Sequence, residues 1–174
     1  MNTRNLLAAL LAVFLAACSQ TSPEPKKGGA ELLAPFKTDL KAALSEGMQD
    51  GAVAAIAACN EAAPGIAQAL SADGVRMGRS SHKLRNPDNA PPAWLVPVLD
   101  DYASGQSDLA PRSVVLEDGR TAYAEPIMMQ PLCLNCHGEV LLPDVAARIT
   151  ELYPNDQATG FGVGDFRGVF WVEF

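Results

Sequence analysis

Positive charge, aromatic side chains, cysteine and histidine are all scarce in this chain. Only 13 lysines and arginines stand against 20 aspartates and glutamates, so the net charge is −7. A broad nucleic-acid-binding surface is therefore not expected, because binding phosphates needs clustered basic residues. Aromatic residues make up 6%, yet hydrophobic residues reach 48%, which excludes wholesale disorder. A length of 174 residues fits one folded domain.

Long hydrophobic runs are also missing, apart from one at residues 6–17. That run is too short to span a bilayer as a mature helix, and Arg4 precedes it. It ends in Leu-Ala-Ala followed by Cys18, the pattern of a bacterial lipobox. We therefore expect residues 1–17 to be a lipoprotein signal peptide and Cys18 to be the acylated residue. An ordinary secretory signal cleaved nearby is the alternative.

The segment after this cysteine predicts a membrane-tethered protein. Residues 18–30 are rich in proline, serine, glycine and charge, without an apolar period, and indicate a flexible tether. Multiple acyl chains on Cys18 would hold the domain at the periplasmic face of a bacterial membrane. The uncharged Ser19 favours sorting to the outer membrane.

Residues 31–74 carry helical patterns. Leu32, Phe36, Leu40 and Leu44 recur every four residues and predict a helix with Pro35 in its first turn. An alanine-rich helix is expected from about Asp50 to Asn60, and a further helical turn after Pro64. The apolar face of the alanine-rich helix is expected to contain Val53, Ile56 and Ala57.

Alternating and turn patterns dominate the rest. A strand is expected near 75–79, a loop over 81–92, and a short helix over 94–102 that Pro97 shortens or kinks. Asp118-Gly119 predicts a hairpin between 113–117 and 120–125, and residues 143–153 and 168–174 predict a helix and a closing strand. The fold class predicted for 31–174 is α+β: an antiparallel sheet with N-terminal helices and helical insertions.

The chemistry is concentrated in Cys133-Leu134-Asn135-Cys136-His137, the Cys-x-x-Cys-His motif of haem c attachment. Two thiols three residues apart can form thioethers with the two vinyl groups of one porphyrin, and the next residue supplies an axial imidazole. The motif predicts one covalent haem c. A Cys133–Cys136 disulfide and a redox dithiol are alternatives, although a redox dithiol prefers a thioredoxin-type βαβ unit. Zinc would need further ligands, and only Cys59 and His82 remain.

Cys59 is left over once lipid and haem have taken the other three cysteines. Alanines surround it, so a large flat ligand could approach closely. It is either a buried inert thiol or a thiolate ligand of the iron opposite His137. Other candidates for that position are His82, Met77, Met128 and Met129, or a water molecule.

Several segments form a pattern that covers most of the domain: Cys59 with Pro64 and Ile66, and residues 75–81, 84–91, 123–127, 133–138 and 153–161. In these segments the domain resembles the haem-binding Tll0287-like family, whose members have a PAS-like fold. The resemblance implies that His137 and Cys59 ligate the iron, and that the sheet is PAS-like with added helices. Many members of the family carry the domain as the sensory part of kinases or cyclases, whereas we expect no output domain here.

The densest basic cluster lies at residues 76–85. Haem propionates are anionic and bind arginine well, so Arg79 and Arg85 are the expected propionate partners. A solvated basic loop is the alternative. Asp165 and Arg167 are expected to form a turn or a surface pair before the last strand.

Three functions are compatible with such a site. A redox or diatomic-gas sensing module would use release of Cys59 from the iron, and a one-electron carrier would use the six-coordinate iron with a redox partner protein. A peroxidase-like enzyme would need an open sixth position and a distal His/Arg arrangement, and no such arrangement is recognisable. We therefore expect a sensor or a carrier rather than an enzyme.

Overall fold

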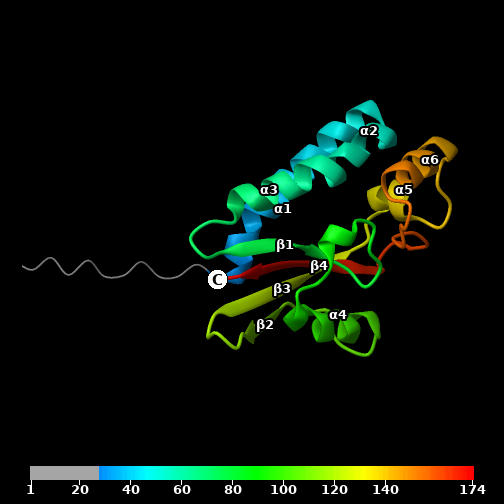
Figure 1. The fold of residues 1–174 in the computed structure, drawn as a ribbon. Helices are drawn as coiled ribbons and strands as arrows, with labels where there is room; N and C mark the ends of the chain where they lie inside the picture. The colour runs from blue at the N-terminus through cyan, green and yellow to red at the C-terminus, as the bar shows by residue number, and fades with distance from the viewer. Residues whose placement is uncertain (1–27) are drawn as a thin grey trace, which may run out of the picture.

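Four antiparallel strands form the sheet on which the other elements pack (Figure 1). In chain order they are β1 (Arg76–Ser80), β2 (Arg112–Val115), β3 (Thr121–Met128) and β4 (Phe166–Glu173), and in space they run β1-β4-β3-β2. The structure is a computed structural model that describes residues 28–174. The predicted signal peptide, Cys18 and most of the tether lie outside the described residues.

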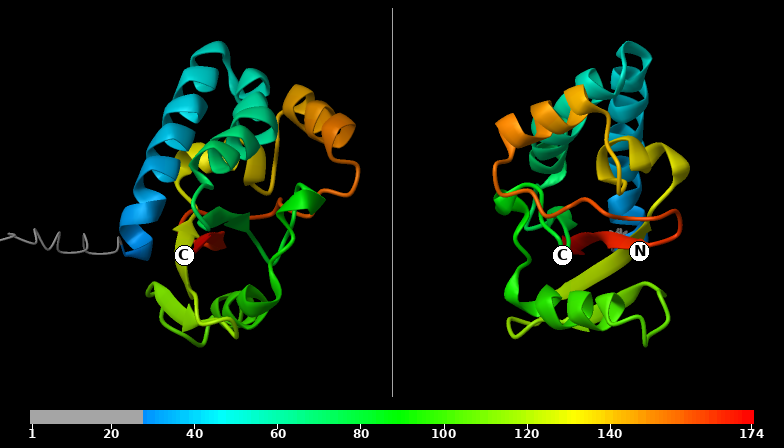
Figure 2. Two further views of the ribbon diagram at one scale, coloured as in Figure 1. Left: turned by 60° about the vertical axis from the view of Figure 1, so that its left-hand side comes forward. Right: turned by 90° about the vertical axis from the view of Figure 1, so that its right-hand side faces the viewer.

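Helices cover both faces and one end of the sheet (Figures 1 and 2). The α+β class, with N-terminal helices and helical insertions, is confirmed. One face carries α1 (Gly29–Gly47), α2 (Ala52–Ala57), the π-helical segment η2 (Ala58–Ala62) and α3 (Ala63–Leu70), the other carries α4 (Val96–Ala103), and α5 (Leu134–His137) and α6 (Pro143–Leu152) lie at one end. Short 3₁₀ turns precede or join these elements at Met48–Asp50, Pro87–Asn89, Ala93–Leu95 and Pro131–Cys133. No helix within residues 28–174 is long and apolar enough to cross a membrane.

The first predicted helix forms, but it begins earlier than expected. It starts at Gly29, where a Cβ atom would lie 2.3 Å from the ring of Tyr123, so the chain is already packed on the sheet there. Pro35 therefore lies in the second turn and not in the first. Proline is tolerated at that point because the helix is exposed around it, and the carbonyl that loses its partner can bind water.

The alanine-rich helix also differs in detail. It begins after Gly51, whose φ of 100° favours glycine, and not after Asp50. Val53 and Ala57 were expected on the apolar face but are exposed, Val53 by 37%, whereas Ala55 and Ile56 are buried. Ala55 faces α1 at such close range that a Cβ on Gly47 would lie 2.8 Å from its Cα atom. The close crossing of α1 and α2 thus decides which side is buried.

The predicted hairpin is confirmed, with a longer turn than expected. Leu116 donates its amide to the Arg120 carbonyl at 2.8 Å, which leaves three residues in the loop. Gly119 occupies the left-handed region at φ 82°, as the last position of a three-residue hairpin loop requires. Pro97 lies in the first turn of α4, so it helps to start that helix and does not kink it.

Alternation along β4 divides the core between the two faces. Phe170 and Val172 pack towards α1 and α3, together with Leu33 and Phe36. Val169 packs towards α4 with Leu95, Leu99 and Tyr102. This alternation fails at the start of β4, where the residues facing β3 shift register.

Candidate functional site

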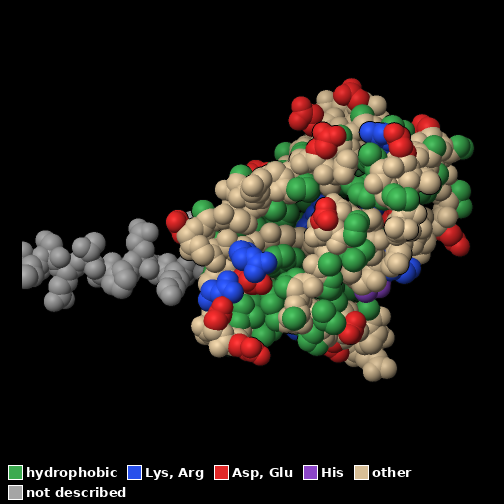
Figure 3. Space-filling view, viewed as in Figure 1, with side chains coloured by type: hydrophobic (Ala, Val, Ile, Leu, Met, Phe, Trp, Pro, Cys, Tyr) green, Lys and Arg blue, Asp and Glu red, His purple; other side chains and the backbone are tan. Residues whose placement is uncertain are grey.

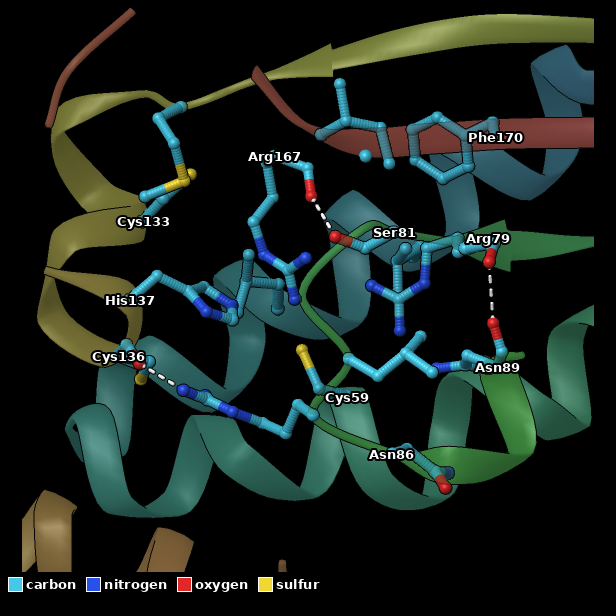
Figure 4. A pocket seen from close by; sticks show the side chains of 18 of the residues that line it. Cys59, Arg79, Ser81, Asn86, Asn89, Cys133, Cys136, His137, Arg167 and Phe170 are labelled. Atoms are coloured by element: carbon cyan, nitrogen blue, oxygen red, sulfur yellow. Dashed lines mark hydrogen bonds between the residues drawn. The ribbon is translucent and has the colours of Figure 1, made fainter. Parts of the chain in front are cut away.

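One cavity of about 410 Å³ lies where α1, α2 and η2 meet the end of the sheet and α5. Its size is in the ordinary range for ligand pockets. Figure 4 shows the side chains of Cys59 and His137 directed into the same space from opposite elements. All residues predicted to hold a cofactor inside the domain line this one cavity: Cys59, Arg79, Arg85, Cys133, Cys136 and His137.

The Cys-x-x-Cys-His motif folds into two short turns. Cys133 ends the 3₁₀ turn that Pro131 opens, and α5 carries Cys136 and His137. Both motif thiols are free and partly buried. Burial raises the pKa of the Cys136 thiol.

The alternatives to haem attachment gain no support from residues 28–174. No disulfide joins Cys133 to Cys136. The strands of the sheet are all antiparallel, so no thioredoxin-type βαβ unit is present in this part of the chain. No group of three or more histidine, cysteine or acidic side chains gathers there as a metal cluster would require.

The imidazole of His137 is oriented by one backbone carbonyl. Its Nδ1 atom lies 2.7 Å from the carbonyl oxygen of Ala158. A carbonyl can only accept, so Nδ1 carries the proton and Nε2 keeps a free lone pair. Burial, reinforced by Arg167 and Arg85, lowers the pKa of His137 to about 3. The ring is therefore neutral and suited to ligate a metal through Nε2.

The chain segment 153–161 wraps around this histidine. The amide of Phe161 donates to the His137 carbonyl at 3.1 Å, and the amide of Gly160 donates to the Gly138 carbonyl at 3.1 Å. The Ala158 amide in turn donates to the Asp156 carboxylate at 2.8 Å. The segment thus fixes both the backbone and the ring of His137.

Arg85 clamps the same segment to the motif. Its guanidinium binds the Asp156 carboxylate through two nitrogens, at 3.1 and 3.0 Å, and both side chains are about one-tenth exposed. It also donates to the carbonyls of Cys136 at 2.5 Å and Ala158 at 3.2 Å. Its Nε atom and one terminal nitrogen are therefore bound by the protein, and its charge is already compensated by Asp156.

Cys59 lies in the π-helical segment between α2 and α3, one residue before Asn60. Single π-helical turns inside α-helices are frequent at functional sites, because they alter the direction of a side chain. The Tyr153 hydroxyl donates to Asn60 Oδ1 at 2.8 Å and so ties this turn to the segment around His137. Cys59 also borders a second, smaller cavity of about 130 Å³ on the far side from the motif.

The other candidates for the position opposite His137 lie elsewhere. His82 is exposed and stacks on Phe166, with ring centroids 5.5 Å apart. Met77 is buried in the core beneath α1 and α3, and Met128 is not part of the cavity wall. Met129 lines the cavity but packs against Cys133, on the motif side.

Arg167 is the site residue that sequence reasoning missed. The expectation that it forms a surface pair or turn with Asp165 is wrong for the arginine: Asp165 closes the turn by accepting from the Gly162 amide at 2.7 Å, whereas Arg167 lines the cavity. Figure 4 shows its side chain directed into the same cavity as Cys59 and His137.

A β-bulge explains why alternation could not predict this direction. Gly168 pairs with Ile127 and Phe166 pairs with Met128, so Arg167 is the extra residue on β4. Such a bulge turns one side chain away from its expected face. Ser81 holds the bulge by donating its hydroxyl to the Arg167 carbonyl at 2.6 Å.

Comparison with known proteins agrees with the resemblance stated above. The model of the Tll0287-like family matches residues 8–174. Among solved structures, the chain is similar to the crystal structure of the cyanobacterial heme-protein Tll0287, with 27% identity and a TM-score of 0.62. That similarity covers 83% of this chain and 91% of the other. No protein in the curated set matches the chain.

Proposed function

The chain belongs to the Tll0287-like family, and from that premise we propose that it is a membrane-tethered c-type haem protein that acts as a redox or diatomic-gas sensing module. The observation that carries the proposal is that Cys133, Cys136, His137 and Cys59 all border one cavity. Two thiols, a neutral imidazole and a further sulfur are the donor set that covalent attachment and two axial ligands require.

The residues of the cavity suit a flat apolar ring. Its wall includes Leu40, Ala55, Ile56 and Phe170, and the small side chain at position 55 leaves room close to the helix backbone. Cys133 and Cys136 would form the thioethers, and His137 and Cys59 would ligate the iron from the two sides. A bound haem supplies a one-electron couple and, where an axial ligand leaves, a site for a diatomic molecule.

The surroundings of Cys59 favour sensing over electron transfer alone. Its thiol lies in a π-helical turn and borders a second cavity, so the sulfur has space to move away from His137. The turn is continuous with α2 and α3, which pack on α1 and β1. Movement of Cys59 would therefore be transmitted to the helical layer.

The proposed location rests on the first residues of the chain. A signal peptide over 1–17 would be removed, and lipid on Cys18 would hold the domain at the periplasmic face of a bacterial membrane.

 The uncharged Ser19 supports the outer membrane as the site of anchoring. Treating cells with an inhibitor of lipoprotein signal peptidase should then leave residues 1–17 on the protein, which mass spectrometry of the intact chain would detect.

Covalent haem is the first part of the proposal to test. The full chain is expressed with a cytochrome c maturation system, and the haem that resists acid–acetone extraction is measured. We expect one haem per chain, and none after Cys133→Ala with Cys136→Ala. Haem that resists extraction from the double variant would contradict the attachment site.

The sensing role is tested separately by recording absorption spectra before and after dithionite. Loss of Cys59 ligation on reduction, or on adding CO or NO to the reduced protein, supports a sensor. Unchanged ligation in both states, with fast electron exchange, would support the one-electron carrier instead.

A further inference from the structure

The wall of the large cavity is strongly cationic although the chain as a whole is acidic. Acidic side chains are spread over the face of the molecule seen in Figure 3. The cavity wall includes no aspartate or glutamate, but it includes five basic side chains: Lys37, Lys41, Arg79, Arg85 and Arg167.

Two of these five cations are paired with carboxylates of the protein. Lys37 pairs with Glu125 at 2.6 Å, and Arg85 is bound by Asp156 as described above. Lys41 is exposed on α1, where water solvates it. Arg79 and Arg167 are different, because neither forms a salt bridge with any residue in 28–174.

The Arg167 side chain lies in the cavity wall with few hydrogen-bond partners. The only hydrogen bond of its side chain to a described residue runs from one guanidinium nitrogen to the Lys83 carbonyl, at 3.3 Å. The guanidinium also lies over the ring of Phe161, 5.4 Å from its centroid. A guanidinium has five N–H donors, so most of them are left for a ligand. Burial, followed by repulsion from Arg85 and Arg79, lowers the pKa of Arg167 to about 10.

We infer that Arg79 and Arg167, and not Arg85, bind the two propionate carboxylates of the haem. The inference rests on the proposed function. Two unpaired guanidinium groups in one cavity match a ligand with two carboxylates and an apolar body. Charge-assisted hydrogen bonds between guanidinium and carboxylate would offset the cost of burying Arg167.

The backbone around Arg167 is built to direct it inward. The β-bulge makes Arg167 the extra residue of β4, and Ser81 binds its carbonyl. Gly168 follows, where a Cβ atom would lie 2.2 Å from the Ser80 carbonyl oxygen. The start of β4 can therefore approach the end of β1 only with glycine at this position, and this approach sets the direction of Arg167.

The test compares haem with haem dimethyl ester, in which both propionates are neutral. The full chain carrying Cys133→Ala and Cys136→Ala is titrated with each, so that binding is reversible. We expect the ester to bind about ten- to a hundredfold more weakly, the range for hydrogen bonds to charged groups. Adding Arg167→Gln or Arg79→Gln should reduce this ratio several-fold, as a double-mutant cycle requires for groups in contact.

Arg85→Gln is the matched control. It removes a guanidinium from the same wall, but one that Asp156 already binds, so both ligands should weaken together and their ratio should stay the same. A ratio that is unchanged by Arg167→Gln and Arg79→Gln, or that changes only with Arg85→Gln, overturns the inference.

The covalent protein provides a second measurement that does not depend on reversible binding. Infrared spectra of protein carrying ¹³C-labelled propionates report the carboxylate stretching bands. These bands should shift in Arg167→Gln and stay in place in Arg85→Gln, and the reverse pattern would overturn the inference. Failure to find any haem would instead contradict the proposed function itself.

Discussion

The two faces of the sheet belong to the same strands but differ in how they are packed. On the α4 face, Leu95, Leu99 and Tyr102 are no more than 2% exposed, and the residues packed there are almost all apolar. On the α1 face, the same strands border a cavity with cationic walls and three free thiols. The closely packed face stabilises the domain, so the opposite face can keep an open cavity that costs packing energy.

The largest loss of stability is expected from breaking the buried ion pair between Arg85 and Asp156 on the cavity face. Asp156→Ala leaves Arg85 charged, one-tenth exposed and without its carboxylate. We expect a loss of about 4 kcal/mol in the free energy of unfolding, as for other broken buried ion pairs. Urea denaturation followed by circular dichroism measures the loss.

Glu151→Ala is the control for this variant, because Glu151 pairs with Arg148 on the surface and is 67% exposed. It should cost less than about 1 kcal/mol. Equal losses for the two variants would show that the Asp156 pair does not support the cavity face.

The second largest loss of stability is expected on the α4 face. A variant there tests whether stability can fall while the haem site stays unchanged. Leu99→Ala should cost about 3 kcal/mol, because Leu99 is 2% exposed in a closely packed cluster. The absorption spectrum of the haem-loaded protein should not change. Val96→Ala, on the same helix but 41% exposed, should cost under about 1 kcal/mol. A spectral change in Leu99→Ala would mean that the two faces are not independent.

The helices and the hairpin on the two faces could be predicted from local sequence patterns, whereas the side-chain contacts in the cavity wall could not. The four-residue stripe of α1 and the Asp118-Gly119 turn depend on nearby residues, so the sequence predicted the helix and the hairpin, although not the length of the turn. Arg85 and Arg167 depend on partners far along the chain. Arg85 was expected to bind a haem propionate, and nothing local indicated that Asp156 would bind it.

Arg167 shows the limit most clearly, because a bulge cannot be recognised from a strand pattern alone. Gly168 was the available signal. A glycine inside a strand often marks a bulge or a close approach between backbones, and here it marks both.

Gly168→Ala tests whether this close approach directs Arg167, and it should cause an intermediate loss of stability. Its Cβ atom would overlap the Ser80 carbonyl, so we expect about 2 kcal/mol of destabilisation together with a displaced Arg167. Gly162→Ala is the control, because its Cβ atom would make only an ordinary contact, 3.6 Å from Asp165. Denaturation midpoints of both variants are compared, and equal midpoints would contradict the close approach.

The smallest effect is expected at the hydrogen bond behind Cys59. Tyr153→Phe removes the donor to Asn60 and should cost about 1 kcal/mol. The π-helical turn would become less constrained, so the ferric spectrum should broaden without a change of ligands. Tyr123→Phe is the control, since no hydrogen bond within residues 28–174 involves the Tyr123 hydroxyl. A broadened spectrum in both variants would argue against a specific role for the Tyr153 contact.

The most direct test of the central claim is the ferric electron paramagnetic resonance spectrum of the haem-loaded protein, compared with that of Cys59→Ala. Ligation by His137 and Cys59 predicts a low-spin thiolate-type signal that is lost in the variant while the haem stays covalently attached. A high-spin signal in the unsubstituted protein, or the same low-spin signal in both proteins, would contradict the account.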